Sequence, residues 1–178
     1  MQSYLHFMAV LIATFQDIPA LVALINSAYR GEGSKKGWTT EADLIKGELR
    51  IDEPALAALM KADDAVFLKY LNDRGEIEGC VFIQKTSDGL YLGMLSVSPS
   101  EQAKGIGKQL MNEAQNHARH LGCDRIFMRV ISARTELISW YEKQGYYNTY
   151  RTEPFPGDTR FGVPTQPVEF MIMEKMIT

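Results

Sequence analysis

The residues best suited to chemistry lie where a predicted strand passes into a predicted helix, in the segment Gln102-Ala-Lys-Gly-Ile-Gly-Lys108. The start of a helix offers backbone N–H groups that have no partner within the helix, and the helix dipole adds partial positive charge there. Gly105 and Gly107 carry no side chains, so an anionic ligand can approach the backbone closely. The segment is therefore a candidate binding loop for a phosphorylated ligand.

The spacing of this loop distinguishes three kinds of phosphate-binding motif. A Walker loop would need a glycine at position 102 and a serine or threonine at position 109, and glutamine occupies both places. A dinucleotide-binding fingerprint would need a third glycine at position 110, where a leucine stands. What remains is the pattern Gln-x-x-Gly-x-Gly from Gln102 to Gly107. This pattern resembles the acetyl-CoA pyrophosphate loop of the GNAT superfamily of N-acyltransferases.

A second motif, Trp140-Tyr-Glu-Lys-Gln-Gly-Tyr146, resembles the Tyr-x-x-x-Gly-Phe helix end of the same family. Tyr141 stands in the place of the tyrosine that faces the thioester sulfur in relatives. An amine that attacks a thioester displaces a thiolate, and a phenol with a pKa of about 10 can give that sulfur a proton. The alternative is that Tyr141 only packs on the apolar face of its helix, beside Leu137 and Ile138. The glycine loop upstream favours the catalytic interpretation.

The resemblance implies further contacts with acetyl-CoA at the strand end and the loop. The main chain of Leu95 and Val97 would pair with the pantetheine arm as an added strand would, and a neighbouring amide would polarise the thioester carbonyl. Gln102 would brace the loop. Lys104 and Lys108 would add positive charge, unless both are simply solvated surface lysines. The backbone amides expected to cradle the pyrophosphate are those of Gly105, Ile106, Gly107 and Lys108.

The general base is harder to identify. A lysine-like substrate amine with a pKa of about 10.4 must lose a proton before it attacks. Several relatives carry a glutamate on the strand before the loop, but Leu90-Tyr-Leu-Gly-Met-Leu-Ser-Val97 contains no acid. Glu32 is the candidate, because the loop after the first helix usually walls the acceptor site in this fold; alternatively, it is an ordinary solvated glutamate. A second departure is Arg134, which stands where relatives often carry an asparagine.

Composition limits the class of protein. A chain of 178 residues that is 46% hydrophobic and 23% charged is typical of one folded domain, here 1–178. A net charge of −3 argues against nucleic acid or an anionic membrane as the main partner. Cys80 and Cys123 suggest no disulfide framework, and no metal-ligand spacing is present. The apolar run 7–13 is too short for a membrane span and lacks a basic n-region, so we expect a cytoplasmic location.

Periodicity and turn residues predict an α/β (α+β) chain with the element order β-α-α-β-β-β-α-β-α-β-β. This is the order of the GNAT fold, a mixed and mostly antiparallel sheet of about seven strands flanked by helices. A capping-box pattern at Thr40 and Asp43 predicts an additional helix from there to about residue 50. Leu121 is expected on the inner face of the helix that follows the glycine loop. Strands are expected at 5–13, 65–71, 77–85, 90–97, 125–131, 146–151 and 168–176, and further helices at 18–30, 54–62 and 135–144.

The resemblance implies an N-acetyltransferase that moves an acetyl group from acetyl-CoA to a primary amine by direct attack in a ternary complex. The acceptor is a small metabolite or a protein amine, walled by residues 29–38 and by the loop 155–162, where Arg160 could bind a carboxylate. A homodimer is compatible with the resemblance. One alternative is a catalytically silent acyl-CoA-binding sensor. Another is a structural protein in which 102–110 is an empty helix cap.

Overall fold

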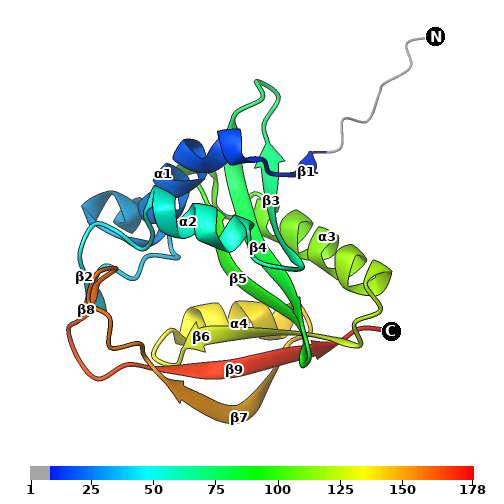
Figure 1. Ribbon diagram of the computed structural model, residues 1–178. Helices are drawn as coiled ribbons and strands as arrows, with labels where there is room; N and C mark the ends of the chain where they lie inside the picture. The colour runs from blue at the N-terminus through cyan, green and yellow to red at the C-terminus, as the bar shows by residue number, and fades with distance from the viewer. Residues whose placement is uncertain (1–8) are drawn as a thin grey trace.

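The computed structural model describes residues 9–178, which form a seven-stranded sheet with the order β1-β3-β4-β5-β6-β9-β7 (Figure 1). All neighbouring strands run antiparallel except β5 and β6, which are parallel. The mixed, mostly antiparallel sheet expected from the sequence is thereby confirmed. The strands of this sheet are β1 (Val10–Ile12), β3 (Ala65–Leu71), β4 (Ile77–Thr86), β5 (Gly89–Val97), β6 (Arg125–Ile131), β7 (Tyr147–Pro154) and β9 (Glu169–Met176).

The sheet opens between β5 and β6. The two strands pair at Leu90 with Ile126 and at Tyr91 with Phe127, and no pairing continues toward the end of β5 within the described residues. In Figure 1, β6, β9 and β7 run across the direction of β4 and β5. The register between β4 and β5 also shifts near Met94, whose φ is +51°. Such a bulge bends a strand, and here it turns the second half of β5 away from β6.

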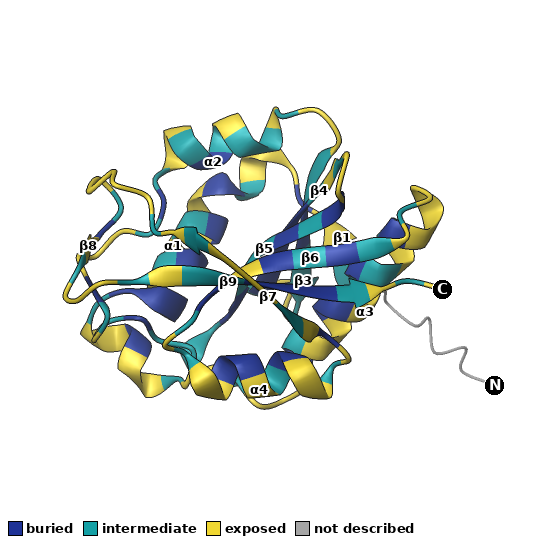
Figure 2. Cartoon of the chain, turned by 90° about the horizontal axis from the view of Figure 1, so that it is seen from below, coloured by how far each residue is buried: buried dark blue, intermediate teal, exposed yellow. Residues whose placement is uncertain are grey.

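Helices cover both faces of the sheet, because apolar side chains of β3 and β4 alternate between two cores. Phe67 and Phe82 pack with α1 and α2, whereas Leu68 and Val81 pack with α3 and α4. Figure 2 shows the buried residues gathered in the central strands and on the inner sides of the helices. The helices are η1 (Phe15–Asp17), α1 (Ile18–Tyr29), η2 (Glu32–Lys36), α2 (Glu53–Met60), η3 (Pro99–Glu101), α3 (Ile106–His120) and α4 (Thr135–Lys143).

The helix predicted from residue 40 to about 50 is wrong. The chain there makes turns and the two-residue strand β2 (Ile45–Lys46). The side-chain oxygen of Asn26 in α1 accepts hydrogen bonds from the backbone amides of Arg50 at 2.7 Å and Ile51 at 3.1 Å, and so holds this segment against α1. The carboxylate of Glu41 is buried among arginines. These tertiary contacts override a local capping pattern of modest strength.

A second strand pair was not predicted. β8 (Val163–Pro164) lies in the loop between β7 and β9 and pairs antiparallel with β2. The backbone amide of Thr165 extends this contact by donating to the carbonyl of Leu44 at 2.9 Å. Gly162 has a φ of +130°, and a Cβ there would overlap Ile45. The strand pair thus joins two segments that lie far apart in the sequence.

Two smaller predictions also need correction. Leu121 is 37% exposed, because α3 ends at His120 before the leucine can turn toward the core. The opening strand predicted over 5–13 is limited to Val10–Ile12 within the described residues, and residues 5–8 lie outside them.

Candidate active site

A cavity of about 300 Å³ lies where the end of β5, the start of α3 and the inner face of α4 meet. We call it the loop cavity. It brings both sequence motifs together, because the glycine loop forms one wall and α4 forms another. Residues that line it include Leu95, Val97, Gly105, Gly107, Trp140 and Tyr141.

The glycine loop shapes the mouth of this cavity. Gly105 precedes the first residue of α3 with a φ of +86°, a conformation that strains residues with a side chain. A Cβ on Gly107 would lie 3.5 Å from Trp140 Cη2 and 3.9 Å from Val97 Cγ2. The first backbone amides of α3, starting at Ile106, have no acceptor one turn earlier in the helix. The loop therefore presents N–H donors to an anion and keeps the approach free of side chains.

Gln102 connects this loop to the segment that follows η2. Its Oε1 accepts a hydrogen bond from the backbone amide of Trp38 at 2.8 Å. Its Nε2 donates to Thr39 Oγ1 at 2.8 Å and to the carbonyl of Val97 at 3.1 Å. A Cβ on Gly37 would overlap the Gln102 side chain, so the glycine allows this close approach. Gln102 thus links the glycine loop to a separate wall of the cavity.

Tyr141 lies in α4 and is 6% exposed. Burial raises the pKa of its phenol, and the neighbouring hydroxyl groups of Tyr29 and Tyr146 raise it further. The ring packs edge-on against Trp140, with centroids 5.2 Å apart, and against Tyr146 at 5.9 Å. The group is therefore a fixed, protonated phenol at the wall of the cavity across the pH range in which most enzymes work.

The edge of β5 that faces the opening carries main-chain groups free of the sheet ladder. The amide of Ser98 donates to the Glu78 carbonyl of β4 at 2.8 Å, so the main chain of Val97 points to the opposite edge. β6 has already diverged at that point. The Leu95 carbonyl accepts a hydrogen bond from the hydroxyl of Tyr29. An extended ligand can reach this edge of β5 and still leave the pairing with β4 intact.

A second, smaller cavity of about 40 Å³ lies on the β6 side of the same opening. We call it the arginine cavity, because Arg50, Arg129 and Arg134 line it. Several residues line both cavities and so mark the place where the two approach each other. The shared residues are Tyr29, Leu95, Leu137 and Tyr141.

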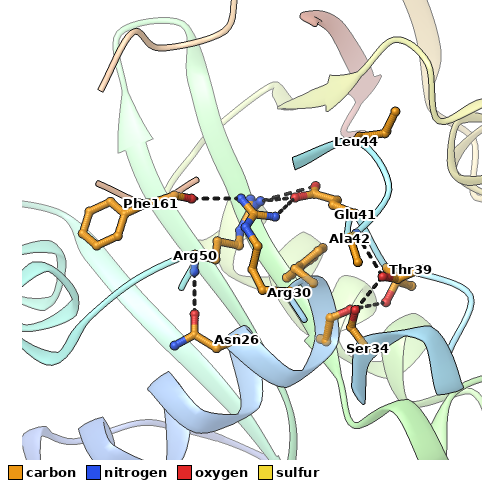
Figure 3. A network of polar contacts seen from close by, with 12 residues as sticks. Asn26, Arg30, Ser34, Thr39, Glu41, Ala42, Leu44, Arg50 and Phe161 are labelled. Atoms are coloured by element: carbon orange, nitrogen blue, oxygen red, sulfur yellow. Dashed lines mark hydrogen bonds and ion pairs between the residues drawn. The ribbon is translucent and has the colours of Figure 1, made fainter. Parts of the chain in front are cut away.

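One buried carboxylate organises the arginines. Glu41, whose side chain is 5% exposed, forms ion pairs with Arg30, with Arg50 at 3.1 Å and with Arg134 at 3.4 Å. Figure 3 shows Arg30 and Arg50 converging on Glu41 from α1 and from the segment before α2. Arg134 is the residue that precedes α4. The arginine that replaces the asparagine of relatives is thus part of a buried charge cluster.

Charge and burial have opposite effects on the ionisation of this cluster. Burial alone would raise the pKa of Glu41, but Arg50, Arg134 and Arg30 together lower it below its ordinary value. Burial raises the pKa of Tyr29, although the Arg50 guanidinium, 4.4 Å above the Tyr29 ring, opposes this. Glu41 therefore stays ionised and is a poor acceptor for a proton from a substrate amine.

The structure does not bring Glu32 to Tyr141. The Glu32 side chain is 87% exposed and pairs with Lys35 at 2.8 Å, and Glu32 lines neither cavity. The two loop lysines also differ from each other. Lys104 pairs with Glu101 at 2.8 Å, whereas Lys108 lines the loop cavity.

Two residues expected around the acceptor lie elsewhere. Trp38 lines the loop cavity, with its ring centroid 6.1 Å from that of Trp140. Arg160 lies over the ring of Phe161 at 4.3 Å and lines neither cavity. Glu41 and Arg50 could not be identified from the sequence, because only the tertiary fold brings them to Arg134.

The described residues do not support a cysteine nucleophile, a metal site or a membrane-spanning helix. Cys80 is fully buried, and burial raises the pKa of its thiol to about 12, so it is not a nucleophile at neutral pH. Among residues 9–178, no group of three or more His, Cys, Asp or Glu side chains is arranged to hold a metal ion. Within the same range, no helix has both the length and the apolar composition needed to cross a membrane.

The comparisons with known proteins agree with this geometry. The Acetyltransferase (GNAT) family profile matches residues 20–146. The uncharacterized protein YdhI of Bacillus subtilis is 30% identical over 90 residues, which cover 51% of this chain and 55% of YdhI. The chain thus matches little more than half the length of this curated relative.

Solved structures show the same fold at low sequence identity. The ribosomal-protein-S18-alanine N-acetyltransferase of Escherichia coli has a TM-score of 0.70 and 15% identity, over 95% of this chain and 93% of that one. The yncA protein of Salmonella typhimurium, solved with its cofactor acetyl-CoA, has a TM-score of 0.69 and 17% identity, with coverage of 95% and 93%. These structures show the same fold, and the family profile, which matches more than half of the chain, shows that the chain belongs to the GNAT family of acetyltransferases.

Proposed function

We propose that this enzyme transfers an acetyl group from acetyl-CoA to a primary amine by direct attack in a ternary complex. The observation that carries the proposal is the loop cavity, which joins the N–H donors of the glycine loop to Tyr141 and to the free edge of β5. Pyrophosphate would bind at the amides of Gly105 to Lys108, and the pantetheine arm would lie along Leu95 and Val97. The thioester would then reach the place where the two cavities approach each other.

Tyr141 would act as the general acid. The amine nitrogen attacks the acyl carbon, the carbon–sulfur bond breaks, and the leaving sulfur takes a proton from the phenol. The phenol recovers a proton that the attacking nitrogen has lost. The position of Tyr141 in the walls of both cavities supports this role. Burial raises the pKa of the phenol, which keeps it protonated when the thiolate forms but makes it a weaker acid. The general base stays a prediction: Glu32 lies outside both cavities, which favours loss of the first amine proton to water.

The function is tested by a thermal-shift titration with acetyl-CoA, CoA, ATP and NAD in parallel, followed by a thiol-release assay over an amine panel. A ligand that binds only the folded state raises the melting temperature by mass action. We expect a shift with the two CoA species alone and thiol release with at least one amine. Binding without thiol release would favour a silent acyl-CoA sensor. No shift at millimolar CoA would overturn the site assignment.

Further proposals rest on composition and resemblance. We propose that residues 1–178 form one N-acetyltransferase domain and that the enzyme acts in the cytoplasm, without a nucleic acid or membrane partner. A homodimer stays a prediction from the resemblance alone. Size-exclusion chromatography with light scattering tests it directly.

A further inference from the structure

The arginine cavity is built around an excess of positive charge. Three guanidinium groups, those of Arg30, Arg50 and Arg134, surround the single carboxylate of Glu41, so the cluster carries two uncompensated positive charges. Glu41 is also the one acidic residue among those that line the cavity in the described chain. Buried charges without partners are costly, and a cluster of this kind is stabilised by an anionic ligand.

The hydrogen-bonding capacity of the arginines is only partly used. Arg30 holds two parts of the protein together, because it donates to Glu41 and, at 3.3 Å, to the carbonyl of Phe161. In the described residues, the side chain of Arg50 donates only to Glu41, through Nη1, and its buried Nε has no partner. The side chain of Arg134 likewise donates only to Glu41, at 3.4 Å, and is 8% exposed. Both of these arginines line the cavity.

Arg129, the remaining arginine of the lining, does not share this excess. Its Nε donates to Glu153 at 2.6 Å, and the pair lies at the exposed rim. The buried Nε of Arg30 also has no partner in the described residues, but Arg30 does not line the cavity. The unused donors that line it therefore belong to Arg50 and Arg134, next to the residues that both cavities share.

The unused donors of Arg50 and Arg134 lie near the place where we propose that the reaction occurs. Tyr141 lines the arginine cavity as well as the loop cavity, so an anion held by Arg134 lies close to the phenol. The volume of about 40 Å³ suits a group the size of a carboxylate or a few water molecules. An amine attached near that group would face the thioester.

We propose, building on the proposed acetyltransfer, that the acceptor is a small amine carrying a carboxylate, as in an amino acid, and that Arg50 and Arg134 bind this carboxylate. Guanidinium groups recognise carboxylates by paired, charge-assisted hydrogen bonds. The ion pair with Glu41 keeps both arginines in place before the acceptor arrives. Arg134 is then a specificity-determining residue.

The test is a thiol-release assay with the wild-type enzyme, acetyl-CoA and matched acceptors. Common L-amino acids are compared with their carboxamides and with the corresponding aminoalkylphosphonates. We expect kcat/KM for the best carboxylate acceptor to exceed that of its carboxamide by at least about tenfold, as loss of a charge-assisted contact implies. The amine of the carboxamide is less basic and more often deprotonated, so the comparison is biased against the proposal. The phosphonate arm shows whether the cavity selects a carboxylate or accepts any anion.

Variants locate the recognition. Arg134→Gln and Arg50→Gln are each expected to abolish the preference for the carboxylate, mainly through KM, and to leave the affinity for acetyl-CoA unchanged. Arg74→Gln, in the exposed turn between β3 and β4, removes the same charge from the surface and should keep the preference. Turnover of carboxamides as fast as carboxylates by the wild type would overturn this inference and leave the acetyltransfer standing. The absence of amine-dependent thiol release with every acceptor would overturn both.

Discussion

The backbone amide of Trp38 donates a 2.8 Å hydrogen bond to Oε1 of Gln102. Through this contact the segment after η2 forms a wall opposite the glycine loop. The two tryptophans on these walls, Trp38 and Trp140, then lie with their ring centroids 6.1 Å apart. One glutamine side chain thus sets the width of the loop cavity.

Replacing Gln102 by alanine should weaken acetyl-CoA binding about tenfold and lower stability by about 1–3 kcal/mol, because net contributions of hydrogen bonds are about 0.5–1.5 kcal/mol each. The side chain makes three such bonds, to Trp38, Thr39 and Val97. Isothermal titration calorimetry and denaturant unfolding measure the two effects. Gln16→Ala, at an exposed position of η1, is the matched control. Unchanged acetyl-CoA affinity in the Gln102 variant would limit its role to stability.

Tyr141→Phe should lower kcat by about 10²-fold, the lower end of general acid catalysis, with little change in acetyl-CoA affinity. Steady-state kinetics with a saturating amine measure this effect. Tyr146→Phe is a demanding control, because Tyr146 is also buried and packs against Tyr141, yet its hydroxyl has no hydrogen-bond partner in the described residues. Removing that hydroxyl should keep kcat and leave stability equal or slightly higher. Equal losses in both variants would indicate packing rather than proton donation.

The two loop glycines should respond differently to substitution. Gly105→Ala places a side chain at a φ of +86° with no atom within 4 Å, so the cost is backbone strain of about 1–2 kcal/mol. Gly107→Leu relieves the low helix propensity of glycine but extends into the loop cavity toward Trp140. The first variant should mainly lower the melting temperature, and the second should mainly weaken acetyl-CoA binding. A Gly107→Leu protein that binds acetyl-CoA normally would show that the cavity is not the cofactor site.

Glu41 makes folding stability depend on acidic pH. Its folded pKa lies below its ordinary value of 4.5, so the unfolded chain binds a proton first as the pH falls. The stabilisation is fully present above about pH 4.5 and is lost as pH drops toward the folded pKa. The free energy of unfolding in urea, measured at several pH values from about 3 to 7, should show this decline.

Glu41→Gln should flatten that decline and cost about 3–5 kcal/mol at neutral pH, because Arg30, Arg134 and the partly exposed Arg50 lose their countercharge. Asp17→Asn gives a milder reference, since Asp17 pairs with Lys69 at 2.8 Å near the surface and its pKa is also lowered. An unchanged pH profile in the Glu41 variant would contradict the linkage.

The fold could be predicted from sequence where local pattern and tertiary packing agree. The positions of β3 and β4, the turns that follow them and the periodicity of α3 as far as Ala118 matched the structure. The segment 40–50 could not be predicted this way. There the decisive contacts come from Asn26 and from three arginines, and no local pattern records them.

The two sides of the candidate site also differ in how well the sequence predicts them. The cofactor side comes from two contiguous motifs whose spacing is visible in the sequence, around Gly105 and Tyr141. The proposed acceptor side depends on Glu41, Arg50 and Arg134, which separate elements contribute. An isolated buried glutamate among arginines has no sequence signature, because burial itself arises only from the fold.

The pairing of β2 with β8 means that the proposed acceptor side depends on two separate parts of the chain. β2 belongs to the region that carries Glu41 and Arg50, whereas β8 follows the part of the chain that the family profile covers. Arg30 joins the same two parts through the carbonyl of Phe161. If the proposed sites are correct, a new acceptor preference therefore requires exchanging both parts together, while the proposed CoA-binding half can remain unchanged.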